Sequence, residues 1–188
     1  MKKIIVIHGY FASPYDHWFP WLQDKMRMVY NLDVDILPMP TPETPSVEAW
    51  LATIHESLGT PDKETFVIAH SLGCVTLLRY LDTHKESFSL GGMILVSPFD
   101  KPLTLFPVLD SFVDVTLDYA KLARVVDQKY VIVSDNDTFV SPAITKALSA
   151  KLDCALLEIP EGGHFLGAEG FELFPEVYEV LKKMITKY

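Results

Sequence analysis

A serine, an aspartate and a histidine each follow a short apolar run of this sequence, and together these residue types can make a nucleophile. They are Ser71, Asp137 and His164. A serine hydroxyl is a poor nucleophile until a neighbouring base removes its proton, and histidine serves as that base when a carboxylate orients its ring. We therefore predict that Ser71 attacks a carbonyl group, with His164 as the base and Asp137 as the acid.

Small residues flank the candidate nucleophile. Ser71 lies in Ala69-His-Ser-Leu-Gly73, where the residues two positions away on either side have little or no side chain. A tight turn from a strand into a helix needs such neighbours, because the turn strains the backbone and brings other segments close to it. The pattern predicts an exposed serine hydroxyl at the start of a helix.

An oxyanion formed by this attack needs two backbone donors. The Leu72 amide follows the nucleophile directly and is the first candidate. The second should come from the loop after the first apolar run, where Gly9 lets the backbone approach closely. We predict the Tyr10 amide as this donor, with the Phe11 amide as the alternative.

Two aspartates compete for the role of the acid. Asp135 and Asp137 both lie just beyond the apolar run that ends at Ser134. One would orient the His164 ring and the other would organise the turn, a common role for aspartate. Asp137 is favoured because Asp-x-x-Val-x-Pro, which ends at Pro142, resembles the acid turn of many α/β-hydrolases, where the proline opens a helix.

Short runs rich in branched apolar residues alternate with longer amphipathic runs, a pattern typical of strands and helices that follow one another along the chain. The order Ser, Asp, His, each after a strand, is that of α/β-hydrolases. We therefore predict a compact α/β-hydrolase fold with a doubly wound, mostly parallel sheet of about six strands, flanking helices and no large cap domain. The predicted strands are Lys3–His8, Asp33–Leu37, Thr65–Ala69, Met93–Ser97, Tyr130–Ser134 and Ala155–Ile159. The predicted helices lie near Trp18–Tyr30, Val47–Leu58, Leu72–Asp82, Pro142–Leu152 and Pro175–Lys187.

The chain length favours a single domain over residues 1–188. Residues 98–114 lie between the fourth and fifth predicted strands, are rich in proline, leucine and phenylalanine, and are called the lid segment below. This segment has room for a turn or a short helix. Apolar residues of the lid segment and of the region after the first strand are candidates to bind substrate in an acyl pocket: Phe11, Trp18, Phe99, Leu103 and Phe106.

Three other histidines near these positions are interpreted as structural. His70 directly precedes Ser71, so its side chain should point away from the nucleophile and pack or support the site. His8 is expected to brace the loop of Gly9, Tyr10 and Phe11, which is called the oxyanion loop below. His17 with Trp18 is expected to mark the start of a helix with an anchoring aromatic ring, although contact with substrate is the alternative.

Composition excludes several other functions. The net charge is −9 and no run of Lys or Arg interrupts it, so we expect neither nucleic acid nor a membrane as partner. The histidines, cysteines and glycines lack the spacing of metal, disulfide or nucleotide sites, so we expect no metal and no cofactor. The apolar run after the first three residues is too short for a signal peptide, and we expect a cytoplasmic monomer or small homo-oligomer.

Several short segments, spread over nearly the whole chain, have the residues and the order found in one family of known proteins. They are His8-Gly9-Tyr10 with His17-Trp18, Pro38–Pro45 followed by Trp50, Ala69-His-Ser-Leu-Gly73, Gly91-Gly92, Ser97, Asp135-Asn-Asp137 and Gly162-Gly-His-Phe165. Together they resemble the small serine hydrolases of the YdeN and retinoblastoma-binding-protein-9 family, most of all its bacterial YdeN-like branch. The resemblance implies a compact α/β-hydrolase with a triad of Ser71, Asp137 and His164. It also implies an esterase-type activity that is weak or unassigned in many members of the family, and it implies no particular physiological substrate.

These observations predict a serine hydrolase of carboxylesterase type that forms an acyl-enzyme intermediate with a small ester, thioester or amide. The alternative is an interaction protein that keeps the hydrolase fold with little or no turnover, as the resemblance also implies for some family members. The presence of all three triad residues and of the glycine in the oxyanion loop favours the enzyme. A nucleotide-binding fold is disfavoured, because its glycine fingerprint is missing.

Overall fold

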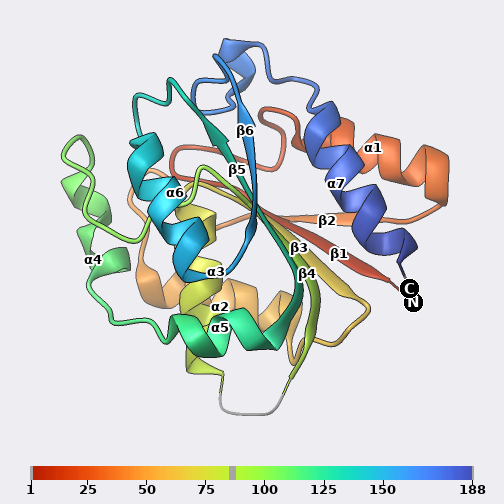
Figure 1. The fold of residues 1–188 in the computed structure, drawn as a ribbon, viewed down its shortest axis with the longest axis horizontal. Coiled ribbons are helices and arrows are strands. Elements are labelled where there is room, and N and C mark those ends of the chain that lie inside the picture. Colours follow the sequence, from red (N-terminus) through yellow and green to blue (C-terminus); the bar gives the residue numbers. More distant parts are fainter. Residues whose placement is uncertain (1, 85–87, 188) are drawn as a thin grey trace.

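The computed structural model describes residues 2–84 and 88–187, and these residues form one six-stranded sheet between two layers of helices (Figure 1). The strand order is β2-β1-β3-β4-β5-β6, and all neighbouring strands are parallel. The α/β-hydrolase fold predicted from the sequence is confirmed, and the sheet is parallel throughout rather than mostly so. The strands are β1 Lys3–Ile7, β2 Val34–Leu37, β3 Thr65–His70, β4 Leu90–Val96, β5 Val126–Ser134 and β6 Ala155–Ile159.

The helices of the described ranges are α1 Phe19–Tyr30, α2 Val47–Leu58, α3 Leu72–Thr83, α4 Asp110–Val113, α5 Tyr119–Val125, α6 Pro142–Lys151 and α7 Pro175–Thr186. Two short 3₁₀ helices, η1 Pro107–Leu109 and η2 Gly167–Glu169, complete them.

Local residues explain several helix ends. The Ser46 side chain caps α2 by accepting a hydrogen bond from the Ala49 amide. Prolines open α6 and α7, where a missing N–H costs nothing.

The inner strands β1, β3 and β4 are buried almost throughout because helices cover both faces of the sheet, whereas the edge strand β6 is largely exposed. Ile5 and Ile7 of β1 pack into the core on the side of α2 and α3, whereas Ile4 and Val6 pack into the core on the side of α1 and α7. Figure 1 shows α1 and α7 on one side of the sheet and the other long helices on the opposite side. This arrangement leaves the carboxyl ends of the strands free to carry loops, and the candidate site residues lie in these loops.

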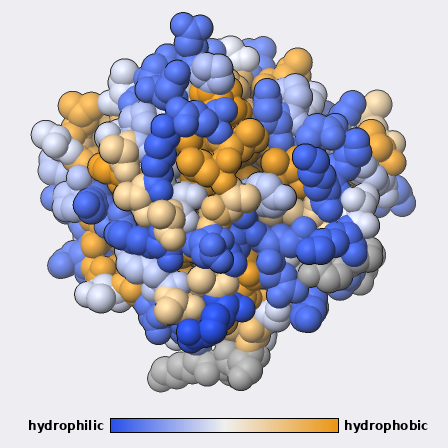
Figure 2. Space-filling model, viewed as in Figure 1, coloured by the Kyte–Doolittle hydropathy of each residue, from blue (hydrophilic) through white to orange (hydrophobic). Residues whose placement is uncertain are grey.

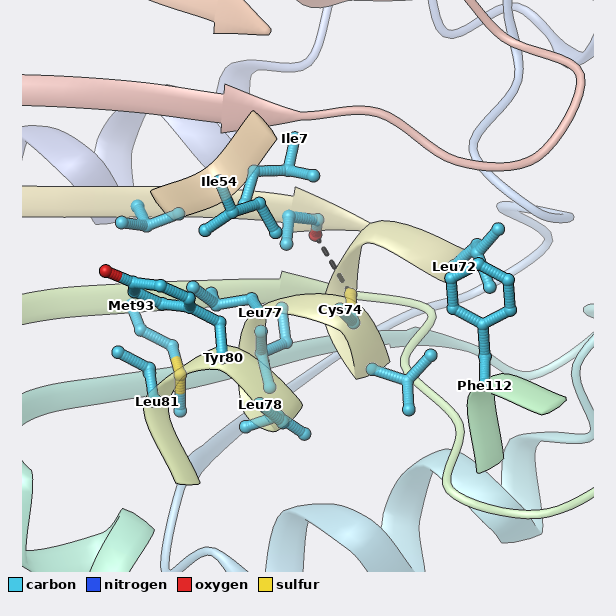
Figure 3. Close-up of a cluster of buried hydrophobic side chains, with 14 of the residues drawn as sticks. Ile7, Ile54, Leu72, Cys74, Leu77, Leu78, Tyr80, Leu81, Met93 and Phe112 are labelled. Atoms are coloured by element: carbon cyan, nitrogen blue, oxygen red, sulfur yellow. Dashed lines mark hydrogen bonds between the residues drawn. The ribbon is translucent and has the colours of Figure 1, made fainter. Parts of the chain in front are cut away.

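The helix that follows Ser71 is held on almost every side. Most residues of α3 are buried, and its apolar side chains pack with Ile7 of β1 and Ile54 of α2 in the cluster of Figure 3. The Cys74 thiol donates to the Ala69 carbonyl at 3.2 Å, the contact drawn in Figure 3. Dense packing of this kind fixes the position of the first turn of α3, and with it the backbone at Ser71.

The lid segment contains only η1 and α4. Phe112 anchors it in the core, where its ring contacts Trp50 edge-on with 5.8 Å between the ring centres. Arg79 of α3 also binds the segment: its guanidinium donates to the carbonyls of Ser111 and Phe112 at 2.7 and 3.0 Å. The lid segment is therefore a pinned loop, and the described residues include no cap domain.

The main differences from the sequence prediction are in β4, β5 and α5. Strand β5 begins at Val126, ahead of the predicted Tyr130. Strand β4 begins at Leu90, ahead of the predicted Met93, and it includes two glycines. A Cβ at Gly91 would lie 2.1 Å from the Lys63 carbonyl oxygen, so a glycine is required by the close approach of that backbone rather than by a turn. Helix α5 was not predicted at all, since it has seven residues and begins at a cap, Asp118, that accepts from the Lys121 amide.

The surface in Figure 2 is largely hydrophilic, with smaller hydrophobic patches between the charged and polar side chains. Within the described part of the chain, no helix is long and apolar enough to cross a membrane.

Candidate active site

Ser71 joins β3 to α3 in a strained turn. Its φ of 53° and ψ of −118° are unusual for a residue other than glycine. A Cβ at Gly73 would lie 2.5 Å from the Ile7 carbonyl oxygen and 2.7 Å from that of His8, so only glycine fits there. The sequence predicted a strained elbow flanked by small residues, and the backbone has that form.

The oxyanion loop approaches Ser71 closely. A Cβ at Gly9 would lie 3.0 Å from the Ser71 Cβ, a contact tight enough to push the loop away. Of the two amides predicted from this loop, that of Phe11 already donates to the Pro42 carbonyl at 3.0 Å. The Tyr10 amide is therefore the better candidate. The Leu72 amide opens α3, where the first N–H groups of a helix have no partner within the helix.

His8 braces this loop from behind. Its Nε2 accepts from the Met39 amide at 3.1 Å, so in the neutral ring Nδ1 carries the proton and donates to the Gly9 carbonyl at 2.9 Å. Burial lowers the pKa of His8, which keeps the ring neutral. Both ring nitrogens are thus used to hold the loop, which agrees with the structural role predicted for this histidine.

The structure places Asp137 against the imidazole of His164. His164 Nδ1 lies 2.8 Å from Asp137 Oδ2, and both side chains are buried. Because an ionised carboxylate can only accept, Nδ1 carries the proton and Nε2 is left unprotonated in the neutral ring. That is the tautomer a general base requires.

The Asp137 carboxylate has further partners at both oxygens. Ser97 Oγ donates to Oδ2 at 2.8 Å, and the amides of Phe139 and Val140 each donate to Oδ1 at 2.9 Å. Burial alone would raise the pKa of Asp137, but the hydrogen bonds from His164, Val140 and Ser97 outweigh burial and lower it. The carboxylate therefore stays ionised and fixed in direction.

Asp135 has a different position. It is exposed, and its Oδ1 accepts from the Glu161 amide at 2.7 Å. Asn136 accepts from the Gly163 amide at 2.7 Å in the same way. Asp135, Asn136 and Asp137 thus bind three successive points of residues 161–169, which we call the histidine loop. Asp135 organises a loop, as expected for the second aspartate, but a neighbouring loop rather than its own turn.

Two more side chains bind the backbone of the histidine loop, Glu169 from within the loop and His70 from β3. Glu169 Oε2 accepts from the amides of His164 and Leu166 at 2.8 and 3.0 Å. His70 Nε2 lies 2.8 Å from the His164 carbonyl oxygen and donates to it. Burial is the main reason why the pKa of His70 lies well below its ordinary value, so this ring remains a neutral donor. The backbone of His164 is therefore held through both its N–H and its C=O.

One cavity of about 390 Å³ contains the candidate nucleophile and base. Ser71, His164 and His17 supply its polar groups together with Tyr10, and the lid segment contributes Leu103, Phe106 and Leu109. The remaining lining residues are Phe11, Phe139, Val140 and Leu166. The hydrogen bonds of the described residues do not include one between Ser71 and His164. Such bonds are often long before substrate binds and tighten in the complex.

Two of the predicted pocket residues lie elsewhere. Trp18 is fully buried, and its ring packs edge-on against Phe19 and Phe174 in the core beside α1 and α7. Phe99 is also fully buried, in the core on the opposite side of the sheet. Both predictions are corrected, because each ring is turned into the protein interior. Phe11, Leu103 and Phe106 do line the cavity.

For His17, contact with substrate was only the alternative expectation, and no role was predicted for Glu169. His17 lines the cavity, and its Nδ1 accepts from the Gly167 amide at 3.0 Å. Glu169 binds the histidine loop as described above. The His17-Trp18 pair was the only feature that pointed to the first of these. A grouping of three or more metal-ligating side chains is also not found in the described ranges.

Comparison with known proteins gives a consistent picture. A family model described as serine hydrolase matches residues 4–183. The YdeN protein of Bacillus subtilis (strain 168) is 40% identical over 186 residues, which cover 99% of this chain and 97% of that protein. The serine hydrolase RBBP9 of Rattus norvegicus is 24% identical over 170 residues, or 90% of this chain and 87% of that protein. The crystal structure of the B. subtilis ydeN gene product covers 99% of this chain and 100% of its own, with a TM-score of 0.95.

Proposed function

Because the chain belongs to the serine hydrolase family, we propose that it hydrolyses small esters, thioesters or amides through an acyl-enzyme intermediate on Ser71. The observation that carries the proposal is the 2.8 Å hydrogen bond between His164 Nδ1 and Asp137 Oδ2, beside the cavity that Ser71 and His164 share. It supplies the orientation and the tautomer that a serine nucleophile needs from its base.

The first half of the reaction forms the acyl-enzyme. His164 Nε2 takes the proton from the Ser71 hydroxyl while Oγ attacks the substrate carbonyl carbon, and the carbonyl oxygen becomes an oxyanion. The imidazolium then gives this proton to the leaving oxygen, sulfur or nitrogen as the carbonyl re-forms. Asp137 stays ionised throughout and stabilises the positive ring.

The second half releases the acid. Water enters in place of the leaving group. His164 Nε2 accepts a proton from this water while the water oxygen attacks the carbonyl carbon of the ester on Ser71. The same proton returns to Ser71 Oγ as the acyl–oxygen bond breaks. In both halves the Leu72 and Tyr10 amides hold the oxyanion, a contribution worth roughly 2.7–4 kcal/mol for one donor in other hydrolases.

The cavity favours a small apolar acyl group. Its apolar wall includes the rings of Tyr10, Phe106 and Phe139. The ring centre of Phe106 lies 5.8 Å from that of Tyr10 and 5.6 Å from that of Phe139. Phe139 in turn contacts the His164 ring edge-on, with 5.3 Å between the ring centres. A volume of about 390 Å³ lies at the lower end of the range of small-molecule sites.

The proposal is tested by labelling with a fluorophosphonate, which reacts with an activated serine and loses fluoride. We expect wild-type protein to be labelled at Ser71, Ser71→Ala to be unlabelled, and His164→Ala to react slower by several orders of magnitude. Ser111→Ala, which removes an exposed serine of the lid segment, is the matched control and should be labelled like wild type.

Folded wild-type protein that does not react would exclude the hydrolase and favour an interaction protein with the same fold. Labelling of Ser71→Ala at the wild-type rate would show that another serine is the nucleophile. Peptide mapping of the labelled wild-type protein would then identify it.

A further inference from the structure

His17 is a polar side chain of the cavity that the proposed mechanism does not use. It precedes α1, and its φ of 54° turns the chain so that the half-buried ring lines the same cavity as Ser71 and His164. The ring also packs edge-on against Phe19 and His70, with 5.5 and 5.8 Å between ring centres. These contacts hold the imidazole in one place.

A backbone amide determines which nitrogen of His17 carries the proton. The Gly167 N–H donates to Nδ1 at 3.0 Å, and an amide nitrogen can only donate. Nδ1 is therefore the acceptor, and Nε2 carries the proton in the neutral ring. Burial, with a smaller contribution from the neighbouring His164, lowers the pKa of His17 against the opposing effect of Asp16. The ring is thus neutral at pH 7 and presents a single N–H.

Within residues 2–84 and 88–187 the structure gives this Nε2–H no hydrogen-bond partner. The lid segment and Phe139 make the surrounding wall apolar. A site of this kind usually fixes its ligand with a few placed polar groups, and a donor left unpaired by a bound ligand costs affinity.

We propose that His17 is a specificity-determining residue whose Nε2–H donates to an acceptor oxygen of the substrate, in addition to the reacting carbonyl. The inference rests on the serine hydrolase chemistry proposed above. It defines the substrate class as esters, thioesters or amides with an apolar part against Phe106 and Phe139 and an ether, hydroxyl or carbonyl oxygen that reaches His17.

Two substitutions separate the functions of the two ring nitrogens. His17→Asn keeps an acceptor close to the position of Nδ1, so it can still bind the Gly167 amide, and asparagine tolerates a positive φ. It has no donor at the position of Nε2. His17→Gln reverses this, because its amide nitrogen reaches the position of Nε2 while the acceptor for Gly167 is lost. His55→Asn changes an exposed histidine of α2 and is the matched control.

The experiment compares labelling rates for matched fluorophosphonates. One pair carries pentyl or 3-methoxypropyl on phosphorus, and the other carries butoxy or 2-methoxyethoxy, so each pair differs by one methylene replaced by oxygen. We expect wild type to prefer the ether member of one pair. His17→Asn should reduce that preference by about tenfold, whereas His17→Gln should keep it within about threefold. His55→Asn should match wild type.

The outcomes separate the two proposals. Wild-type protein that no fluorophosphonate labels overturns the proposed function and this inference together. Labelled wild-type protein whose ether preference is unchanged by His17→Asn in both pairs overturns only the inference, as does an equal loss of rate for both members. Nitrogen-15 NMR gives an independent readout, since His17 must show the Nε2–H tautomer at neutral pH. The Nδ1–H tautomer would contradict the proposal.

Discussion

The histidine loop and the lid segment border the same cavity but are held in different ways. Residues 161–169 are fixed by polar contacts from the acid turn, from His70 and from Glu169. The lid segment instead reaches the cavity with Leu103, Phe106 and Leu109, and it packs into the core with apolar side chains that include the buried rings of Phe99 and Phe112. Hydrogen bonds depend steeply on direction, whereas apolar packing depends mainly on area and volume.

The two regions are therefore expected to control different kinetic properties. Polar substitutions around the histidine loop should change the rate of the chemical step, because they change the direction of the His164 ring. Apolar substitutions in the lid segment should change the binding of the acyl group and leave the chemical step almost intact.

The largest effect is expected at the acid. Asp137→Asn places an amide where His164 Nδ1–H needs an acceptor, which favours the wrong tautomer, so kcat for ester hydrolysis should fall by roughly 10³–10⁴-fold. Asp135→Asn is the matched control, since its amide oxygen can still accept from the Glu161 amide, and it should keep most of the activity. A greater loss in Asp135→Asn would reverse the assignment of the acid.

A smaller loss is expected at Glu169. Glu169→Gln weakens two charge-assisted hydrogen bonds to the amides of His164 and Leu166 while keeping the size of the side chain. We expect kcat to fall about tenfold with little change in KM, measured with a short-chain 4-nitrophenyl ester. Glu172→Gln, at an exposed glutamate nearby, should behave like wild type. A rise in KM at constant kcat would show that Glu169 serves substrate binding instead.

The lid segment should give the opposite kinetic pattern. Phe106→Ala removes the ring between Tyr10 and Phe139, so KM for esters with apolar acyl groups should rise by about three- to tenfold while kcat stays close to wild type. Leu105→Ala, at a side chain that is 63% exposed, is the control. If Phe106→Ala lowered kcat as strongly as Glu169→Gln, the two regions would not differ as described.

The smallest effect concerns stability against pH. Burial holds the pKa of His70 well below 6.5, so below about pH 6.5 the unfolded chain binds a proton that the folded protein does not. Unfolding is therefore favoured as pH falls, by up to roughly 1.4 kcal/mol per pH unit for this one proton. His70→Gln keeps a donor for the His164 carbonyl and cannot titrate.

Thermal unfolding between pH 8 and pH 5 provides the measurement. The melting temperature of His70→Gln should fall less steeply with decreasing pH than that of wild type. His55→Gln, at an exposed histidine, is the control. Equal slopes in wild type and His70→Gln would show that the burial of His70 does not contribute to acid sensitivity.

The sequence predicted the fold well because the relevant patterns are local. The strands that begin at Thr65 and Ala155 can be recognised from the residues within and next to each run. The predicted helix over Val47–Leu58 has the observed bounds, which are set by Ser46 at one end and Gly59 at the other. The glycines of β4 were not recognised as strand residues. The reason for Gly91 is the Lys63 backbone, which belongs to another segment of the chain.

The candidate site was predicted in its reacting residues and less well in its surroundings. Small neighbours and loop glycines mark Ser71 and His164 within a few residues of sequence. Whether an aromatic residue lines the cavity or turns into the core depends on distant packing, so Trp18 and Phe99 could not be told apart from Phe11 and Phe106. The same holds for His17, because its partner Gly167 lies at the other end of the chain.

The hydrogen bonds between residues 135–137 and the histidine loop have a consequence for insertions and deletions. Glu161 and Gly163 take part through their backbone amides, so the spacing of the loop matters more than the side chain of Glu161. Adding or removing one residue between Ile159, where β6 ends, and Glu161 would displace all three contacts at once. We therefore expect variation in length at this end of the sheet to be better tolerated in the lid segment, which is attached mainly by packing of apolar side chains such as Phe99 and Phe112, than in the loop that carries the histidine.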